Sequence, residues 1–176
     1  MKRPAVSRLK ACTVSTFQRS GRRSLLLTGD KGIGKTTLLE SLLENRPVPG
    51  LRSYAVRDGL DVPVQVLLER RGGGAPAVIA QREEGALHPC RWALDGAGTR
   101  WLRALCRGPG EWAAIDEIGF LEQASARYQR ALLELFARKR LLAVVRKGEA
   151  PLLRALLERK DCLVLDLSRF AGGRFT

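Results

Sequence analysis

Gly-Asp-Lys-Gly-Ile-Gly-Lys-Thr stands at residues 29–36 and fits the pattern G-x-x-x-x-G-K-[ST], in which a glycine-rich loop wraps around phosphate groups. Apolar residues 25–27 lead into this loop, and the pattern of residues 37–43 is helical. A strand before the loop and a helix after it would aim a helix N-terminus and several backbone N–H groups at one anion. The sequence therefore predicts a phosphate-binding loop within a strand–loop–helix unit.

The residue types of this loop suit a triphosphate. Gly29, Gly32 and Gly34 let the backbone approach phosphate oxygens without an intervening Cβ atom. The Lys35 ammonium would reach the β- and γ-phosphates, and the Thr36 hydroxyl would ligate Mg²⁺. The predicted nucleotide-binding residues of the loop are Gly29, Asp30, Lys31, Gly32, Ile33, Gly34, Lys35, Thr36 and Thr37.

Length and composition predict one α/β domain. The chain has 176 residues, 45% of them apolar, which suffices for a sizeable core. The residue pattern predicts strands at 24–28, 52–57, 62–68, 77–80, 111–115, 141–145 and 162–167, and helices at 35–44, 99–106, 125–138 and 151–160. This alternation favours a three-layer α/β/α fold with a mostly parallel sheet. Asp58-Gly59 between two apolar runs indicates a hairpin, and hence a small antiparallel insert.

The first 20 residues are basic and weakly patterned, so we expect an arm at 1–20 and a domain at 21–176. The sequence has neither a long apolar run nor a signal-peptide pattern, which predicts a cytoplasmic protein with no membrane span. The four cysteines are scattered, and His88 near Cys90 lacks a second close pair of metal ligands, so reduced thiols are expected.

The formal charge of +13, from 31 Lys and Arg against 18 Asp and Glu, would attract polyanions. Arginines are spread along the whole chain, however, and no helix-turn-helix, zinc-finger or RNP-like pattern accompanies them. We therefore expect the charge to reflect composition, with a nucleic-acid partner as the less favoured alternative.

An apolar run at 112–115 ends in two acidic residues, Asp116 and Glu117. In proteins with this loop, a neighbouring strand carries an Asp that helps to hold Mg²⁺, and Asp116 is the candidate for that position. A carboxylate one residue later can orient a water molecule for attack on the γ-phosphate, which predicts a catalytic role for Glu117. Because a kinase needs no such carboxylate, the pair favours hydrolysis over phosphoryl transfer.

Arg146 follows the next predicted strand, so it would lie at the same edge of the sheet as the loop. Its guanidinium is a candidate for stabilising negative charge in the transition state. A solvated basic turn before the following helix explains the residue equally well.

The segment Ile115-Asp116-Glu117-Ile118-Gly119-Phe120-Leu121-Glu122 resembles the Asp-Glu-Ile-Gly signature of the THEP-type nucleoside-triphosphatases, also called cancer-related NTPases. Other pieces occur in the order of that family: the phosphate loop near the N-terminus, a hairpin, the element Trp92-Ala93-Leu94-Asp95, and a strand that ends in basic residues. The resemblance covers about residues 24–170 and excludes 1–20. It implies a P-loop NTPase fold and slow, Mg²⁺-dependent hydrolysis of ATP, GTP and other nucleoside triphosphates to diphosphate and phosphate.

Carried over by position, the resemblance assigns Lys35 and Thr36 to the phosphates and metal, Asp116 to the metal and Glu117 to the attacking water. The chain departs from the family at three places, the mildest being Leu121, where the family usually has Met. Arg146 stands where the family often has His, and Ser168-Arg169 stands where the family has an Asn-Arg pair near the base. Arg169 is therefore the candidate for the base side.

Two other functions stay open at this point. One is a P-loop kinase for a small molecule or a nucleotide. The other is a nucleotide-dependent switch ATPase that acts with a nucleic-acid or protein partner.

Overall fold

The computed structural model describes residues 3–44 and 46–170, so both ends of the predicted division into an arm at 1–20 and a domain at 21–176 lie outside the described residues. The strands of the described chain are β1 (Ser24–Thr28), β2 (Gly50–Arg57), β3 (Pro63–Arg70), β4 (Ala77–Glu83), β5 (Ala86–Pro89), β6 (Trp112–Ile118), β7 (Arg140–Val145) and β8 (Cys162–Asp166). Its α-helices are α1 (Arg3–Ser20), α2 (Lys35–Leu43), α3 (Arg91–Ala93), α4 (Thr99–Arg107), α5 (Ala126–Arg138) and α6 (Pro151–Leu157). Short π and 3₁₀ turns lie at Leu94–Gly98, Leu121–Ala124 and Leu167–Arg169.

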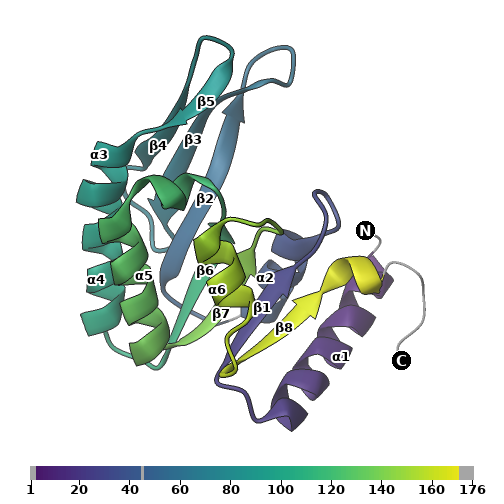
Figure 1. The fold of residues 1–176 in the computed structure, drawn as a ribbon. Coiled ribbons are helices and arrows are strands. Elements are labelled where there is room, and N and C mark those ends of the chain that lie inside the picture. Colours follow the sequence, from purple (N-terminus) through teal and green to yellow (C-terminus); the bar gives the residue numbers. More distant parts are fainter. Residues whose placement is uncertain (1–2, 45, 171–176) are drawn as a thin grey trace.

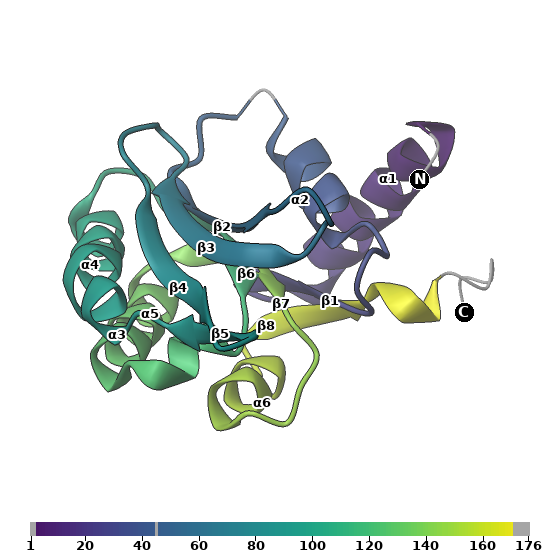
Figure 2. The same ribbon diagram turned by 90° about the horizontal axis from the view of Figure 1, so that it is seen from above.

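All of these strands join one sheet in the order β5-β4-β3-β2-β6-β7-β1-β8 (Figure 1). Strands β2, β6, β7, β1 and β8 run parallel to one another, whereas the pairs β2–β3, β3–β4 and β4–β5 are antiparallel. Helices α4, α5 and α6 cover one face, and α1 and α2 cover the other (Figure 2). The predicted α/β class, with a mostly parallel sheet and an antiparallel part, is confirmed.

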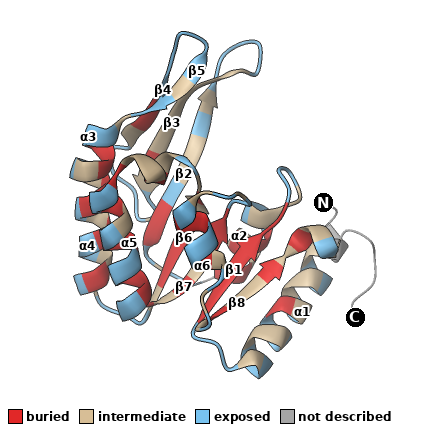
Figure 3. Ribbon diagram, in the orientation of Figure 1, coloured by how far each residue is buried: buried red, intermediate tan, exposed pale blue. Residues whose placement is uncertain are grey.

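The core forms on both faces of the sheet because the central strands are apolar in both directions. Leu26 packs toward α4–α6, while Leu25 and Leu27 pack toward α2. Side chains alternate between the two faces of a strand, so a continuous apolar run is what a strand covered on both sides requires. Figure 3 shows the buried residues concentrated in β1, β6 and β7 and on the inner sides of the helices.

Strand β6 is longer than its apolar run, which predicted a strand at 111–115. It continues to Ile118, and Asp116 and Glu117 lie within it. Arg52 of β2 pairs with Asp116 on one side, and Val145 of β7 pairs with Ile118 on the other. Backbone partners on neighbouring strands extend β6, and a single stretch of sequence does not show them.

The antiparallel wing, which comprises β3–β5 and the outer half of β2, begins at the predicted hairpin. The Asp58 carboxylate accepts hydrogen bonds from the N–H groups of Leu60 and Val62, both at 2.9 Å, and so closes the turn. The wing is larger than expected, since β5 has no counterpart among the predicted strands. It extends beyond the helical layers at the top of Figure 1.

The structure differs from the expected arm at residues 1–20, because Arg3–Ser20 form helix α1. Leu9 and Phe17 pack against the cluster around α2, Thr13 is buried, and the rings of Phe17 and Trp112 meet edge to face at 6.0 Å. Leu9, Thr13 and Phe17 are spaced four residues apart, so they lie on one face of the helix. This apolar face is narrow, and the helical pattern in the sequence is therefore weak. Within the described chain, no helix combines the length and apolar character that crossing a membrane requires.

Gly50 marks a close approach between β2 and β6. A Cβ atom at this position would lie 2.0 Å from the carbonyl oxygen of Ala114, which is backbone and cannot rotate away. We expect Gly50→Ala to lower the free energy of unfolding by about 2 kcal/mol or more, through overpacking. Urea denaturation followed by circular dichroism measures the change.

Gly59→Ala is the matched control for this prediction. A Cβ atom at Gly59, in the hairpin turn, meets nothing within 4 Å. That variant should therefore stay within about 1 kcal/mol of the wild type. Equal unfolding midpoints for the two variants would contradict the close approach at Gly50.

Candidate active site

The phosphate loop lies between β1 and α2, at the carboxyl ends of the parallel strands, where ligands of open α/β sheets bind. A cavity of about 850 Å³ opens there. Its walls come from the loop, from the segment that follows Asp116, from β2 and β3 of the wing, and from Arg146 and Lys147 after β7. Segments far apart in the sequence thus meet at the predicted phosphate site.

Positive φ angles shape the loop, at 136° for Gly29, 78° for Gly32 and 101° for Gly34. Residues with a Cβ atom are strained at positive φ angles, which explains why glycines occupy these three positions. Helix α2 begins directly after Gly34, and no side chain caps its N-terminus. Its first N–H groups are therefore available to an anion, with the positive end of the helix dipole behind them.

Lys35 bridges the loop from inside. Its ammonium donates hydrogen bonds to the carbonyl oxygens of Gly29 and Asp30, both at 2.9 Å. Lys31 and Thr37 also line the cavity. Ile33 is the exception among the predicted loop residues, because it packs against the apolar cluster around α2 and contributes through its position in the backbone.

Asp116 is buried directly behind the loop. The Thr36 hydroxyl donates a hydrogen bond of 3.2 Å to one oxygen of the Asp116 carboxylate, and the residue is 3% exposed. The pKa of Asp116 is raised from 3.8 to about 6, mainly by burial, with the opposing effect of the Thr36 hydrogen bond and a smaller raising effect of the Glu117 charge included. The structure thus brings together the two residues predicted to hold the metal.

These two oxygens fit Mg²⁺. Magnesium takes hard oxygen ligands, and it commonly binds through one or two carboxylates together with substrate phosphates and water. A hydroxyl and a carboxylate 3.2 Å apart, beside a phosphate loop, make such a partial ligand set. Within the described residues no ion pair joins the Asp116 carboxylate, and the charge of Arg52, which favours the ionised form, acts from beyond ion-pair distance and does not outweigh the effect of burial.

Glu117 and Arg146 form an ion pair at the edge of the cavity. The Arg146 Nε atom lies 3.2 Å from Oε1 of Glu117, and the Arg146 N–H donates to the Ile118 carbonyl at 2.9 Å. The Asp116–Glu117 peptide bond is cis. Ser53 of β2 contacts the Glu117 backbone twice, at 3.1 Å to its carbonyl oxygen and 3.2 Å from its N–H. These two contacts of Ser53 fix the Glu117 backbone, while the partly exposed Glu117 carboxylate faces the cavity.

Glu122 closes the turn that follows β6. Its carboxylate is buried and accepts a hydrogen bond of 2.8 Å from the N–H of Gly119. Burial raises the pKa of Glu122, with the hydrogen bonds from the backbone acting in the opposite direction. The turn is thereby held against the core at the point where the chain leaves Glu117.

The other side of the loop rests on the residues after β8. The Asp30 N–H donates to the Ser168 hydroxyl at 2.9 Å, and the Lys147 ammonium lies 3.2 Å from Asp30 and 3.1 Å from Asp166. Arg169, the candidate for the base side, is not brought into the cavity. Its side chain is 86% exposed and lies 3.9 Å from Asp166.

Sequence reasoning did not identify several residues of this cavity. Ser53, Tyr54 and Arg57 reach it from β2, and Lys147 reaches it from the turn after β7. Their positions depend on the pairing of β2 with β6 and of β7 with β1, for which no local motif exists. Only Lys147 carries a weak signal, because it follows a predicted strand next to Arg146.

Comparisons with known proteins bear on the family and the fold of this chain. A family model described as "NTPase" matches residues 24–171. The nucleoside-triphosphatase THEP1 of Archaeoglobus fulgidus is 30% identical over 124 residues, which are 68% of this chain and 74% of that protein. The crystal structure of THEP1 from Aquifex aeolicus superimposes with a TM-score of 0.66 over 82% of this chain and 89% of that one, at 17% identity, and so supports the fold. Helix α1 lies outside the family match.

The buried Asp116 carboxylate predicts a cost in stability that depends on pH. Its folded pKa of about 6 lies above the ordinary value of 3.8, so the folded chain holds the proton more tightly. The cost is absent below about pH 4 and fully present above about pH 6. In metal-free buffer at pH 8, Asp116→Asn should raise the free energy of unfolding by roughly 2 kcal/mol, because one pKa unit is worth about 1.4 kcal/mol.

Urea unfolding in the presence of a chelator, at about pH 4 and pH 8, measures this difference. The Thr36 hydroxyl can still donate to the amide oxygen of the variant. Asp161→Asn serves as a control of opposite sign, because the hydrogen bonds from Arg159 lower the pKa of Asp161. A stability gain for Asp116→Asn that is the same at both pH values would contradict the burial cost.

Proposed function

The chain belongs to the nucleoside-triphosphatase family that includes THEP1, a family of P-loop enzymes, and we propose that it hydrolyses ATP, GTP and related nucleoside triphosphates to diphosphate and phosphate with Mg²⁺. One observation carries the proposal. A phosphate loop, a Thr36 hydroxyl with the buried Asp116 carboxylate behind it, and a Glu117–Arg146 pair meet at one cavity. These are the three parts that cleavage of a triphosphate requires: anion binding, a metal position and a base for water.

Binding of the triphosphate is assigned to the loop and the start of α2. The N–H groups at the uncapped helix end would donate to phosphate oxygens. The Lys35 ammonium would exchange its two carbonyl contacts within the loop for the β- and γ-phosphate oxygens. Charge-assisted hydrogen bonds are stronger than those to neutral carbonyls, so this exchange favours the bound state.

The Thr36 hydroxyl and the Asp116 carboxylate would hold the metal. A bound Mg²⁺ would neutralise charge on the β- and γ-phosphates. With a pKa of about 6, Asp116 is mostly ionised at neutral pH and can act as a ligand. Asp116 is thus a buried carboxylate that makes no ion pair within the described residues, a property that suits a metal carried in with the nucleotide.

Glu117 is assigned to the attacking water. Its carboxylate would accept a hydrogen bond from a water molecule in line with the γ-phosphate and take up the proton as the bond to phosphorus forms. The two contacts of Ser53 with the Glu117 backbone support a fixed position for this group. The adjacent Arg146 would then donate to the charge that develops on the transferred phosphoryl group.

Phosphate release from ATP and GTP with Mg²⁺, without any acceptor, tests hydrolysis against a kinase. Glu117→Gln should still bind nucleotide but release phosphate about 10²–10⁴-fold more slowly, because it removes the base and keeps the shape. Lys35→Ala should lose nucleotide binding, measured by calorimetry.

Glu158→Gln is the matched control, since Glu158 is exposed after α6 and does not line the cavity. It should leave the rate unchanged. An unaltered rate in Glu117→Gln would refute the assigned mechanism, and phosphate release that requires an added acceptor would favour the kinase.

Arg146→Met tests the second assignment. If Arg146 stabilises charge in the transition state, kcat should fall about 10–10³-fold while KM changes little. Arg146→Lys should recover part of the rate, because an ammonium keeps the charge but loses the forked geometry. Arg130→Met, on the exposed side of α5, is the control. A kcat that Arg146→Met leaves unchanged would assign Arg146 to a solvated turn.

A further inference from the structure

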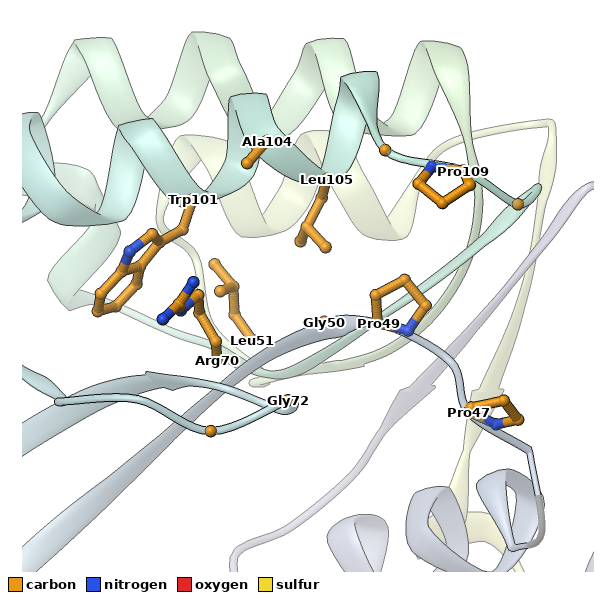
Figure 4. A pocket seen from close by; sticks show the side chains of 13 residues that line it. Pro47, Pro49, Gly50, Leu51, Arg70, Gly72, Trp101, Ala104, Leu105 and Pro109 are labelled. Atoms are coloured by element: carbon orange, nitrogen blue, oxygen red, sulfur yellow. The ribbon is translucent and has the colours of Figure 1, made fainter.

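A second cavity, of about 670 Å³, lies at the edge of the sheet opposite to the phosphate loop (Figure 4). It opens between helix α4, the amino ends of β2 and β6, and the turn that follows β3. None of the described residues that line it also lines the active-site cavity. The two cavities are therefore separate sites on the same sheet.

The walls of this cavity suit a flat apolar molecule. Leu105 points into it from α4, and the ring of Trp101 lies at one end, while Pro49 and Pro109 lie toward the other (Figure 4). The fully buried Leu51 forms part of the floor. The volume of the cavity falls in the range of small-molecule sites, which are mostly apolar with a few polar groups that orient the ligand.

The charge at this cavity is positive. Among the described lining residues Arg70 alone is charged, and its guanidinium lies over the indole ring of Trp101, 5.9 Å from the ring centroid. No ion pair joins Arg70 to a carboxylate of the described chain. The buried Lys139 adds a second cation behind the wall, where it donates to the carbonyl oxygens of Gly108 and Gly110 at 2.7 and 2.5 Å.

We propose that this cavity binds a small aromatic carboxylate and that the bound ligand regulates hydrolysis. The aromatic ring would pack against the apolar wall of Leu105 and Pro49, next to the Arg70–Trp101 pair. The carboxylate would pair with the Arg70 guanidinium, which offers a planar fork of donors for it. An apolar cavity with a single exposed cation selects for this combination over a neutral ring or a cation.

Two connections lead from this cavity to the catalytic residues. Strand β2 begins in the wall at Gly50 and two residues after Leu51 reaches Ser53, which contacts the Glu117 backbone at 3.1 and 3.2 Å. Arg71, next to Arg70, makes two hydrogen bonds of 2.8 and 2.7 Å to Glu40 of α2, the helix that follows the phosphate loop. A ligand that shifts either wall would bias the position of the base or of the loop. This regulatory part rests on the proposed hydrolysis.

Isothermal titration with 2-naphthoate, at low salt and with ADP in excess, tests the site without any need for catalysis. We expect one molecule to bind per chain with a Kd below about 1 mM. Arg70→Met and the neutral analogue 2-naphthalenemethanol should each bind at least about 10-fold more weakly. Ala104→Trp should abolish binding, because Ala104 is an exposed residue of α4 at the cavity and its replacement fills the mouth without entering the core.

Arg103→Met is the matched control, since Arg103 is exposed on the same helix and does not line the cavity. It should bind 2-naphthoate like the wild type, and circular dichroism should show all variants folded. Absence of binding to the wild type, or equal binding by Arg70→Met, would overturn the site. Equal binding of the neutral analogue would overturn its preference for anions.

Steady-state phosphate release with saturating 2-naphthoate tests regulation. The wild-type rate should change at least about two-fold, and the rate of Ala104→Trp should not respond. A wild-type rate that saturating 2-naphthoate leaves unchanged would overturn the regulatory part. Absence of any phosphate release would instead count against the proposed function, while the binding result would stand.

Discussion

The buried carboxylate of Asp116 is the constraint around which the active site is arranged. It lies within β6, 3% exposed, with the Thr36 hydroxyl as its nearest donor. A buried charge that makes no ion pair within the described chain costs stability, and proteins keep such groups where function needs them. The phosphate loop must be in place for Thr36 to reach Asp116, and β6 must lie beside β2 for Ser53 to fix Glu117. The positions of the metal-binding Asp116 and of Glu117 thus both depend on the register of β6 in the sheet.

Strand β2 links the parallel part of the sheet to the antiparallel wing. It begins parallel to β6 at the edge opposite to the loop, and its outer half pairs with β3 in the antiparallel wing. The wing therefore does more than extend the sheet, since Ser53, Tyr54 and Arg57 form one wall of the active-site cavity. The same strand also starts in the wall of the second cavity. A rigid strand that is shared by two cavities is a physical route by which a ligand in one can act on the other.

The sequence predicted the site best where its chemistry is carried by neighbouring residues in one local structure. The loop at Gly29–Thr36 and the acidic pair in β6 were both predicted, because each motif consists of neighbouring residues whose types have few other uses. The boundaries of elements and the weakly patterned segments were harder. Helix α1 was expected as an arm, because only one narrow stripe around Phe17 is apolar. The residue pattern does not predict strand β5, because its residues are mostly exposed and its extended conformation depends on pairing with β4.

Local sequence was sufficient for the strand–loop–helix unit, the residue types that bind phosphate and metal, and the α/β class. These follow from backbone freedom, side-chain chemistry and apolar periodicity, which act over a few residues. Only the tertiary structure showed which side chains contact the predicted site residues: Ser53 contacts Glu117, and Lys147 lies between Asp30 and Asp166. It also placed the Arg169 side chain outside the cavity. Their positions follow from strand order and register, which burial of the whole core selects and which no segment specifies alone.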